Sequence, residues 1–197
     1  CCAVLDSVLA GGEGEDVPSF PEGGLRLGVL EGYVTEHLDS GVGAAFQAML
    51  TRLSRRGVRL TPLTIGELAD LPKINAKGGL VGAEAHAWHA PLLETRADFY
   101  DPWVRERFSA GRSQTAEDYI RVIEARARLR ALVAERQAPF DALLLPTVQI
   151  VAPTIESLAD SAVSAPVNLL CLRNTAVGNF LDLPAIPMPR HDDGAPP

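Results

Sequence analysis

The most constraining feature of the sequence is an amphipathic segment enclosed by two strand-like runs. From Ser40 onward, apolar residues recur at the spacing of one helical face, and Gly57 follows as a stop signal. These residues are Val42, Ala45, Phe46, Met49, Leu50 and Leu53. Residues 25–30 before the helix and 58–60 after it have the composition of short buried strands. A strand, helix, strand order predicts an α/β sheet rather than an all-helical bundle.

Composition narrows the class of protein. With 47% hydrophobic and 22% charged residues, the 197-residue chain is globular, and its length favours one domain. No run approaches the ~18 uncharged apolar residues of a membrane span, so we expect no membrane association. The net charge of −7 argues against a surface that neutralises phosphates, so no direct nucleic-acid partner is expected. The three cysteines cannot all pair, which favours a reducing cytoplasm.

The first ten residues are almost wholly apolar. They predict a helix that ends at Gly11 and Gly12. An apolar helix needs neighbours on most of its sides. We therefore expect residues 1–197 to form a single partial domain, the downstream part of a larger one. An engineered or processed chain is the alternative.

Prolines punctuate the sequence between Ile65 and Ala110. We predict short helices that break at Pro72, Pro91 and Pro102, with a glycine-containing connection over residues 73–82. Each proline is taken as a boundary because it lacks a backbone N–H and clashes with the preceding helical turn.

A long helix is predicted from Thr115, which can cap it, to Pro139. Its apolar face consists of Val122, Ala125, Leu129, Leu132 and Val133. The arginines and glutamates between them predict a solvated face rather than a basic patch. A buried strand is expected at 141–145. Nine of the fifteen prolines lie from Pro139 onward, which predicts turns and short elements there, with an edge strand at 185–188.

No residue in the chain forms a recognisable catalytic or metal-binding motif. His86 and His89 are three residues apart, but a zinc site needs a further ligand and the metalloprotease order is absent. We therefore predict polar positions on a partly buried helix, with Trp88 packing, and no metal. Cys171 lies in an apolar run and is expected to pack as a small hydrophobe. Neither Lys73 nor Lys77 belongs to a phosphate-loop pattern, and no serine lies in a nucleophile elbow. No cofactor is predicted.

The loop over residues 145–153 is a candidate pocket rim. It directly follows a predicted buried strand, and ligands of α/β proteins collect beyond the carboxyl ends of strands. Thr147 would offer a hydroxyl beside apolar walls there. The alternative is a proline-stiffened connection in which Thr147 caps the next turn. Asn174 and Asn179 are likewise either ligand-facing amides or helix-end caps.

Five stretches in this order resemble the downstream part of an amidase signature family enzyme. The family includes bacterial amidases, the glutaminase component of tRNA-dependent amidotransferases and allophanate hydrolase. The stretches are Cys2-Ala-Val-Leu-Asp-Ser-Val-Leu-Ala-Gly11, Leu25-Arg-Leu-Gly-Val-Leu30, Glu84-Ala-His-Ala-Trp-His89, Phe140-Asp-Ala-Leu-Leu-Leu-Pro-Thr147 and Asn179-Phe-Leu-Asp-Leu-Pro-Ala-Ile-Pro-Met-Pro189.

The resemblance implies a mixed β-sheet covered by helices, incomplete in this chain, and hydrolysis of a carboxamide through an acyl-enzyme. In the family one serine attacks, a second serine relays its proton and a lysine acts as base, beside a Gly/Ser-rich oxyanion loop. We expect these groups upstream of this chain, because Lys73 and Lys77 do not match the family lysine and no Gly-Gly-Ser-Ser-like run is present. No catalytic residue is transferred, and the chain alone is predicted to be inactive.

The resemblance carries over three residues of the substrate pocket wall, Pro146, Thr147 and Asn179. The expected partner is a small-molecule amide, and a homodimer is left open. Asp182 stands where many relatives have glycine, which favours other amidases over the tRNA-dependent enzymes. The alternatives are the glutaminase-type component of a tRNA-dependent amidotransferase, and a non-catalytic α/β binding module.

Overall fold

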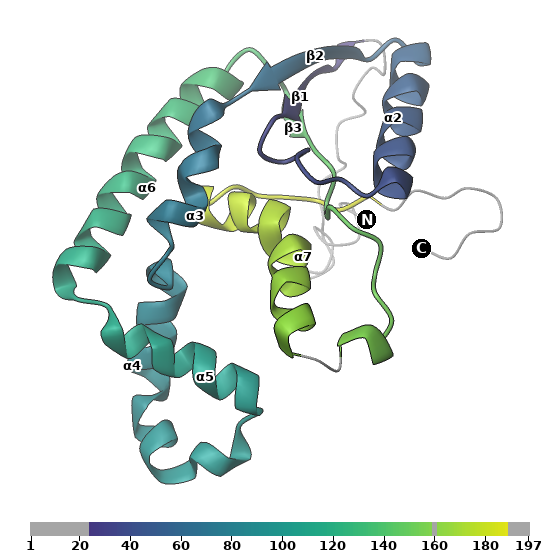
Figure 1. The fold of residues 1–197 in the computed structure, drawn as a ribbon. Coiled ribbons are helices and arrows are strands. Elements are labelled where there is room, and N and C mark those ends of the chain that lie inside the picture. Colours follow the sequence, from purple (N-terminus) through teal and green to yellow (C-terminus); the bar gives the residue numbers. More distant parts are fainter. Residues whose placement is uncertain (1–23, 159–160, 189–197) are drawn as a thin grey trace, which may run out of the picture.

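The computed structural model describes residues 24–158 and 161–188 (Figure 1). In chain order the elements are β1 (Arg26–Glu31), α2 (Ser40–Arg55), β2 (Arg59–Thr64), the 3₁₀ turn η2 (Gly66–Asp70), α3 (Leu71–Ile74), α4 (Gly79–Arg96), η3 (Ala97–Phe99), α5 (Pro102–Ala110), η4 (Gly111–Ser113), α6 (Ala116–Gln137), β3 (Ala142–Leu144), η5 (Glu156–Leu158) and α7 (Ser161–Leu181). The predicted α/β class is confirmed. The helix expected over residues 1–10 lies outside the described residues.

A three-stranded parallel sheet in the order β2-β1-β3 forms one end of the molecule (Figure 1). β1 is central and pairs Val29 with Pro62 of β2 and with Leu144 of β3. β2 is an edge strand of the described sheet, which is where a strand tolerates a proline. At Gly28 a Cβ would lie 2.9 Å from a ring carbon of Phe140, so a residue without a side chain is needed there.

The predicted helix between the first two strands is α2. The Asp39 carboxylate caps it by accepting from the backbone N–H of Gly41 at 2.8 Å. Gly57 follows with φ +84, a conformation that favours glycine, and the chain turns into β2. The strand predicted to end at residue 60 extends to Thr64.

The long helix predicted from Thr115 is α6. Its N-terminus is a capping box, in which the Asp118 N–H donates to Thr115 Oγ1 and the Thr115 N–H donates to Asp118 Oδ2, both at 3.1 Å. The buried positions Val122, Leu129 and Val133 follow the predicted stripe.

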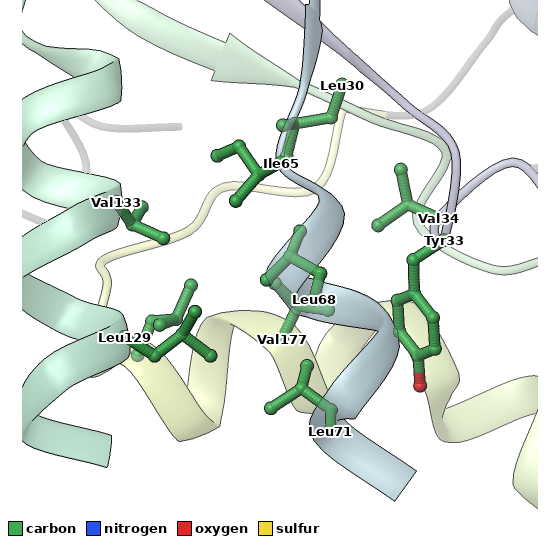
Figure 2. Packing of buried hydrophobic residues seen from close by; sticks show 10 residues of the cluster. Leu30, Tyr33, Val34, Ile65, Leu68, Leu71, Leu129, Val133 and Val177 are labelled. Carbon is green, nitrogen blue, oxygen red and sulfur yellow. The ribbon is translucent and has the colours of Figure 1, made fainter. Parts of the chain in front are cut away.

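The main hydrophobic core lies between the sheet, η2 and helices α3, α6 and α7 (Figure 2). Its buried members are Leu30, Tyr33, Val34, Ile65, Leu68, Leu71, Leu129, Val133, Val177 and Leu181. They come from segments far apart in the chain, so the core fixes how α6 and α7 sit against the strand ends. Helices α4 and α5 lie at the opposite end of the view from the sheet (Figure 1).

Several sequence-based predictions are wrong. The strand expected to be buried at 141–145 is β3, and its residues are half-buried or exposed. The connection expected over residues 73–82 is shorter, because α3 extends to Ile74 and α4 begins at Gly79.

Pro91 does not end a helix but lies inside α4. Its ring removes the N–H that would reach the Ala87 carbonyl, and since both residues are exposed, water can satisfy that carbonyl. The region after Pro139 is not made only of short elements, because α7 runs for 21 residues through Pro166. Residues 185–188 form no strand and continue from α7 as irregular chain.

No helix within residues 24–158 and 161–188 combines the length and the apolar character needed to cross a bilayer. This holds for α7 as well, although several of its apolar side chains, including Leu169, are exposed.

Candidate functional site

Two loops leave the same edge of the sheet, where β1 and β3 end. Because β1 and β3 are parallel neighbours, residues 32–39 and residues 145–153 both begin at their carboxyl ends. This edge is where α/β proteins bind ligands. Figure 1 places α7 between α6 and the segment that follows β3. The candidate site is this junction of two strand-end loops with α7.

Asn174 of α7 joins the two loops. Its side chain is buried, and Nδ2 donates to the Val34 carbonyl at 3.0 Å and to the Pro146 carbonyl at 2.8 Å. Both acceptors are backbone groups that no strand pairs. A buried carbonyl without a hydrogen-bond donor destabilises the fold. The Asn174 amide therefore supplies a donor to one carbonyl of each loop.

Gln149 forms a second link between the loops. It is fully buried, its carbonyl accepts from the Asp39 N–H at 2.8 Å, and its Nε2 lies 3.4 Å from Tyr33 O and 3.5 Å from Val34 O. The side-chain oxygens Gln149 Oε1 and Asn174 Oδ1 are buried and have no hydrogen-bond partner among the described residues. The junction therefore places two uncharged amides under the strand ends.

Arg173 covers the outer side of the junction. Its Nε donates to Tyr33 O at 3.1 Å, its Nη2 pairs with the Glu36 carboxylate, and its guanidinium lies 3.9 Å above the centre of the Tyr33 ring. Burial raises the pKa of the Tyr33 phenol above its usual 10.0; Arg173 opposes this shift and Glu36 adds to it. Tyr33 therefore stays a neutral packing residue at physiological pH.

The structure brings Pro146 and α7 together, but through Asn174 and not through Asn179. Pro146 is buried at the end of β3, and Thr147 follows it with its side chain exposed. Asn179 lies in the last turn of α7 and is exposed. It follows Asn174 by five positions of helix, which turns the two side chains about 140° apart. Whether Pro146, Thr147 and Asn179 contact substrate stays a prediction.

Sequence reasoning missed the roles of Gln149 and Arg173. The available signal was a polar residue inside an apolar run, Gln149 between Val148 and Ile150 and Arg173 after Leu172. Such residues need a partner when they are buried. The sequence could not show that the partners would be backbone carbonyls more than 100 residues away.

Of the polar and aromatic residues predicted to pack on α4, His89 does pack against aromatic side chains, whereas Trp88 is 80% exposed, so its predicted packing is wrong. His89 stacks on Phe108 with ring centroids 4.4 Å apart, and its Nδ1 lies 2.7 Å from the Tyr100 hydroxyl. His86 Nδ1 is buried without a partner among the described residues. Within residues 24–158 and 161–188 no group of three or more His, Cys, Asp or Glu side chains is arranged to hold a metal ion.

A cavity of about 640 Å³ lies elsewhere, between α3 and α6. Its walls include the two lysines of the chain and four acidic residues, and no residue of the strand-end loops or of α7 lines it. On its rim Lys77 Nζ bonds both oxygens of Asp118, at 2.9 and 2.8 Å. These bonds, with those from Thr115, lower the pKa of Asp118 to about 2. Its lysines are separated from the strand ends, so this cavity is not part of the candidate site.

Comparison with known sequences gives one consistent family. The sequence profile of the family described as Amidase matches residues 17–196. An amidase from Pseudomonas putida is 30% identical over 185 residues, which are 89% of this chain and 39% of that protein. A 2-amino-5-chloromuconic acid deaminase from Comamonas testosteroni is 28% identical over 166 residues, or 84% of this chain and 36% of that protein. The chain thus spans less than half the length of these relatives.

Solved structures agree on the fold. A crystal structure of an amidase superposes with a TM-score of 0.69 at 23% identity, covering 91% of this chain and 40% of that one. An allophanate hydrolase variant from Kluyveromyces lactis gives a TM-score of 0.71 at 18% identity, covering 83% of this chain and 26% of that one. At these identities the superpositions establish the shared fold.

Proposed function

The chain belongs to the amidase family, and from that premise we propose that the protein containing it is an amidase-type hydrolase. It cleaves the C–N bond of a small carboxamide and releases a carboxylate with ammonia or an amine. The observation that carries the proposal is the match of the amidase profile to residues 17–196. The 30% identity to an amidase supports it. Because the chain spans only 39% of that relative, the activity is proposed for the whole protein.

We propose that this region supplies the acyl-side wall of the substrate pocket. Pro146 and Thr147 lie at the carboxyl end of β3, the edge where α/β folds bind ligands. The exposed Thr147 hydroxyl provides a polar contact next to the apolar Pro146 and Leu145. Asn179 is proposed as a more distant part of the wall, since it lies in the last turn of α7.

We assign no catalytic residue to this chain. The family resemblance implies attack by a serine, with a second serine and a lysine moving the proton. The serine oxygen bonds the acyl carbon, the C–N bond breaks, the nitrogen leaves with a proton, and water then frees the carboxylate. Loss of a nucleophile or of a base costs orders of magnitude in rate. A pocket wall without them should give no turnover.

The test compares two proteins, the complete reading frame and the 197-residue chain alone. Each is assayed for ammonia or amine release from short aliphatic and aromatic amides. We expect turnover from the complete protein and none above background from the chain alone. Absence of turnover from a folded complete protein on every amide would contradict the proposed activity. Turnover by the purified chain alone would show that it contains an unrecognised nucleophile.

A second substrate class belongs in the same assay. The deaminase from Comamonas testosteroni, named for 2-amino-5-chloromuconic acid, is 28% identical over 166 residues. Release of ammonia from a 2-aminomuconic acid in preference to all simple amides would make this protein a deaminase of unsaturated amino acids. Glutamine is included as the substrate of the amidotransferase alternative, which requires partner proteins for its full reaction.

We place the protein in the cytoplasm with a small-molecule partner and without nucleic acid or membrane. The net charge of −7 and the odd number of cysteines support this placement, and Cys171 has no disulfide partner within residues 24–158 and 161–188. A homodimer is the assembly to test first. Sedimentation of the complete protein at two concentrations would distinguish it from a monomer.

A further inference from the structure

We propose that Asn174 is a positioning residue that fixes the Pro146–Thr147 peptide and thereby sets selectivity for the acyl part of the substrate. The proposal rests on the amidase-type function proposed above. Asn174 acts through the backbone that it holds, since its side chain is only 2% exposed and is enclosed by the two strand-end loops.

The first step is the donor capacity of the Asn174 amide. An amide nitrogen carries two hydrogens, and Nδ2 has one acceptor for each, Pro146 O at 2.8 Å and Val34 O at 3.0 Å. The opposite assignment of the amide would direct its oxygen at two carbonyl oxygens, which repel it. The orientation of the side chain is therefore determined by the two loops together.

The second step is the backbone of Pro146. The pyrrolidine ring fixes φ of Pro146 near −65°. The hydrogen bond from Asn174 holds the Pro146 carbonyl, which restrains ψ. Because the peptide unit is planar, the same restraint orients the N–H and Cα of Thr147. One local constraint, the proline ring, and one tertiary constraint, the bond from Asn174, thus determine where the exposed Thr147 side chain begins.

The third step is a comparison with the other polar links of the junction. The Nε2 contacts of Gln149 to Tyr33 O and Val34 O, at 3.4 and 3.5 Å, are at the long limit for hydrogen bonds. Arg173 bonds Tyr33 O, which belongs to the other loop. Among the side-chain bonds to loop carbonyls, those of Asn174 are the shortest, and they join the two loops beside the backbone bond from Asp39 N–H to Gln149 O at 2.8 Å.

The decisive measurement is a competition between two amides that share a leaving group and differ in acyl length, using the complete protein. The ratio of their kcat/KM values does not depend on the fraction of folded enzyme. For Asn174→Ala we expect this ratio to change about tenfold, because displacement of a wall residue by an ångström has effects of that order or larger. Asn174→Ser, which keeps one donor, should change it less.

Val177→Ala is the matched control. Val177 lies one turn further along α7, is 3% exposed and packs in the core, and its side chain has no donor for either loop carbonyl. It should lower stability and leave the substrate ratio unchanged. An unchanged ratio in both Asn174 variants, or an equal change in Val177→Ala, would overturn the positioning role.

A second readout does not depend on activity and so separates this proposal from the proposed function. The Asp39 N–H donates to Gln149 O across the junction. Its hydrogen exchange should be about tenfold faster in Asn174→Ala than in Val177→Ala at matched global stability, since the junction opens locally. If Asn174→Ala does not fold, the comparison uses Asn174→Ser. Equal exchange at Asp39 would refute the link, whereas absence of all amide turnover with faster exchange would refute only the function.

Discussion

Helices α6 and α7 are nearly equal in length but are specified in different ways. The residues of α6 itself specify this helix, through a capping box at Thr115 and a buried stripe of regular spacing. α7 also buries residues at helical spacing, Asn174, Val177 and Leu181, but it contains Pro166 and is apolar on exposed as well as buried sides, so its apolar residues do not mark one face. Its position is set by residues that reach other segments, such as Asn174 and Val177. Local pattern specifies the first helix, and tertiary contacts specify the second.

The polar side chains of the two helices differ in the same way, except for Arg126 of α6, whose Nε donates to Phe180 O of α7 at 2.7 Å. On α6, Arg128 and Arg121 pair with glutamates four residues earlier and are largely exposed. Such pairs contribute only about 0.3–0.5 kcal/mol each. On α7, Asn174 and Arg173 bond backbone carbonyls of the strand-end loops. The candidate site therefore uses side chains from α7, whose position the local sequence pattern does not determine.

The largest expected effect tests the stripe of α6. Leu129→Ala removes a side chain that is 6% exposed in the main core, and we expect it to lower the free energy of unfolding by about 3 kcal/mol. Ile123→Ala on the same helix is the control, because Ile123 is 45% exposed and should cost less than about 1 kcal/mol. Denaturant unfolding of the complete protein measures both. Equal losses would show that the stripe does not anchor α6.

The same contrast explains how much of the fold could be predicted. α2 and α6 begin and end near the predicted residues because caps, glycines and apolar spacing act within a few residues of the chain. The predictions from proline were wrong at Pro91 and Pro166, where the helix continues although proline disfavours it. A helix can continue through a proline when the carbonyl four residues earlier, which loses its N–H donor, is hydrogen-bonded by water or by another donor. Whether this happens depends on how deeply that carbonyl is buried in the folded chain.

The candidate site could be predicted only in part. The strand-end position of Pro146 and Thr147 follows from the apolar strand that precedes them, which is a local signal, although the structure leaves that strand half-buried. The link from Asn174 to Pro146 joins residues 28 apart, and its link to Val34 joins residues 140 apart. No pattern in a single sequence identifies such pairs, because any buried carbonyl could accept from that amide.

A smaller effect is expected from removing Arg173 of α7. Arg173→Met should lower the free energy of unfolding by about 2 kcal/mol, since it leaves the Tyr33 carbonyl without this donor and removes the charge above the ring. It should also raise the pKa of Tyr33 further, because Arg173 is the group that lowers it. NMR of labelled tyrosine measures this. Arg136→Met, an exposed position at the end of α6, is the control for both quantities.

The N-terminus of α6 gives a pH-dependent prediction. Asp118 has a pKa of about 2, below the usual 3.8, chiefly because Lys77 bonds its carboxylate. A lowered pKa in the folded state means that its contribution to stability is present above about pH 4 and is lost as the pH falls toward 2. Lys77→Met should raise the pKa of Asp118, as followed by carboxyl NMR. Glu117→Gln, one residue earlier, should leave it unchanged; a shift in that control would assign the effect to the helix end as a whole.

The smallest effect concerns the end of α7, where the helix meets α6. Asp182 has φ +61, and the bonds Asp182 N–H to Asn179 O and Leu183 N–H to Gly178 O close the helix as a Schellman motif. Glycine is the usual residue at such a position. Asp182 instead places its carboxylate 3.6 Å from Arg126 and 3.5 Å from Arg130 of α6.

Two substitutions separate these contributions. Asp182→Gly relieves the left-handed conformation and loses exposed ion pairs, so we expect a net change within about 1 kcal/mol. Asp182→Ala loses the same ion pairs without the relief, and should be less stable than the glycine variant by about 1 kcal/mol in denaturant unfolding. Equal stabilities would show that φ at this residue carries no strain. A less stable alanine variant would show that the left-handed backbone at residue 182 is strained for residues other than glycine. Asp182 would then accept this strain and gain ion pairs with α6. Such a replacement of glycine affects stability and implies no difference in chemistry from relatives that have glycine there.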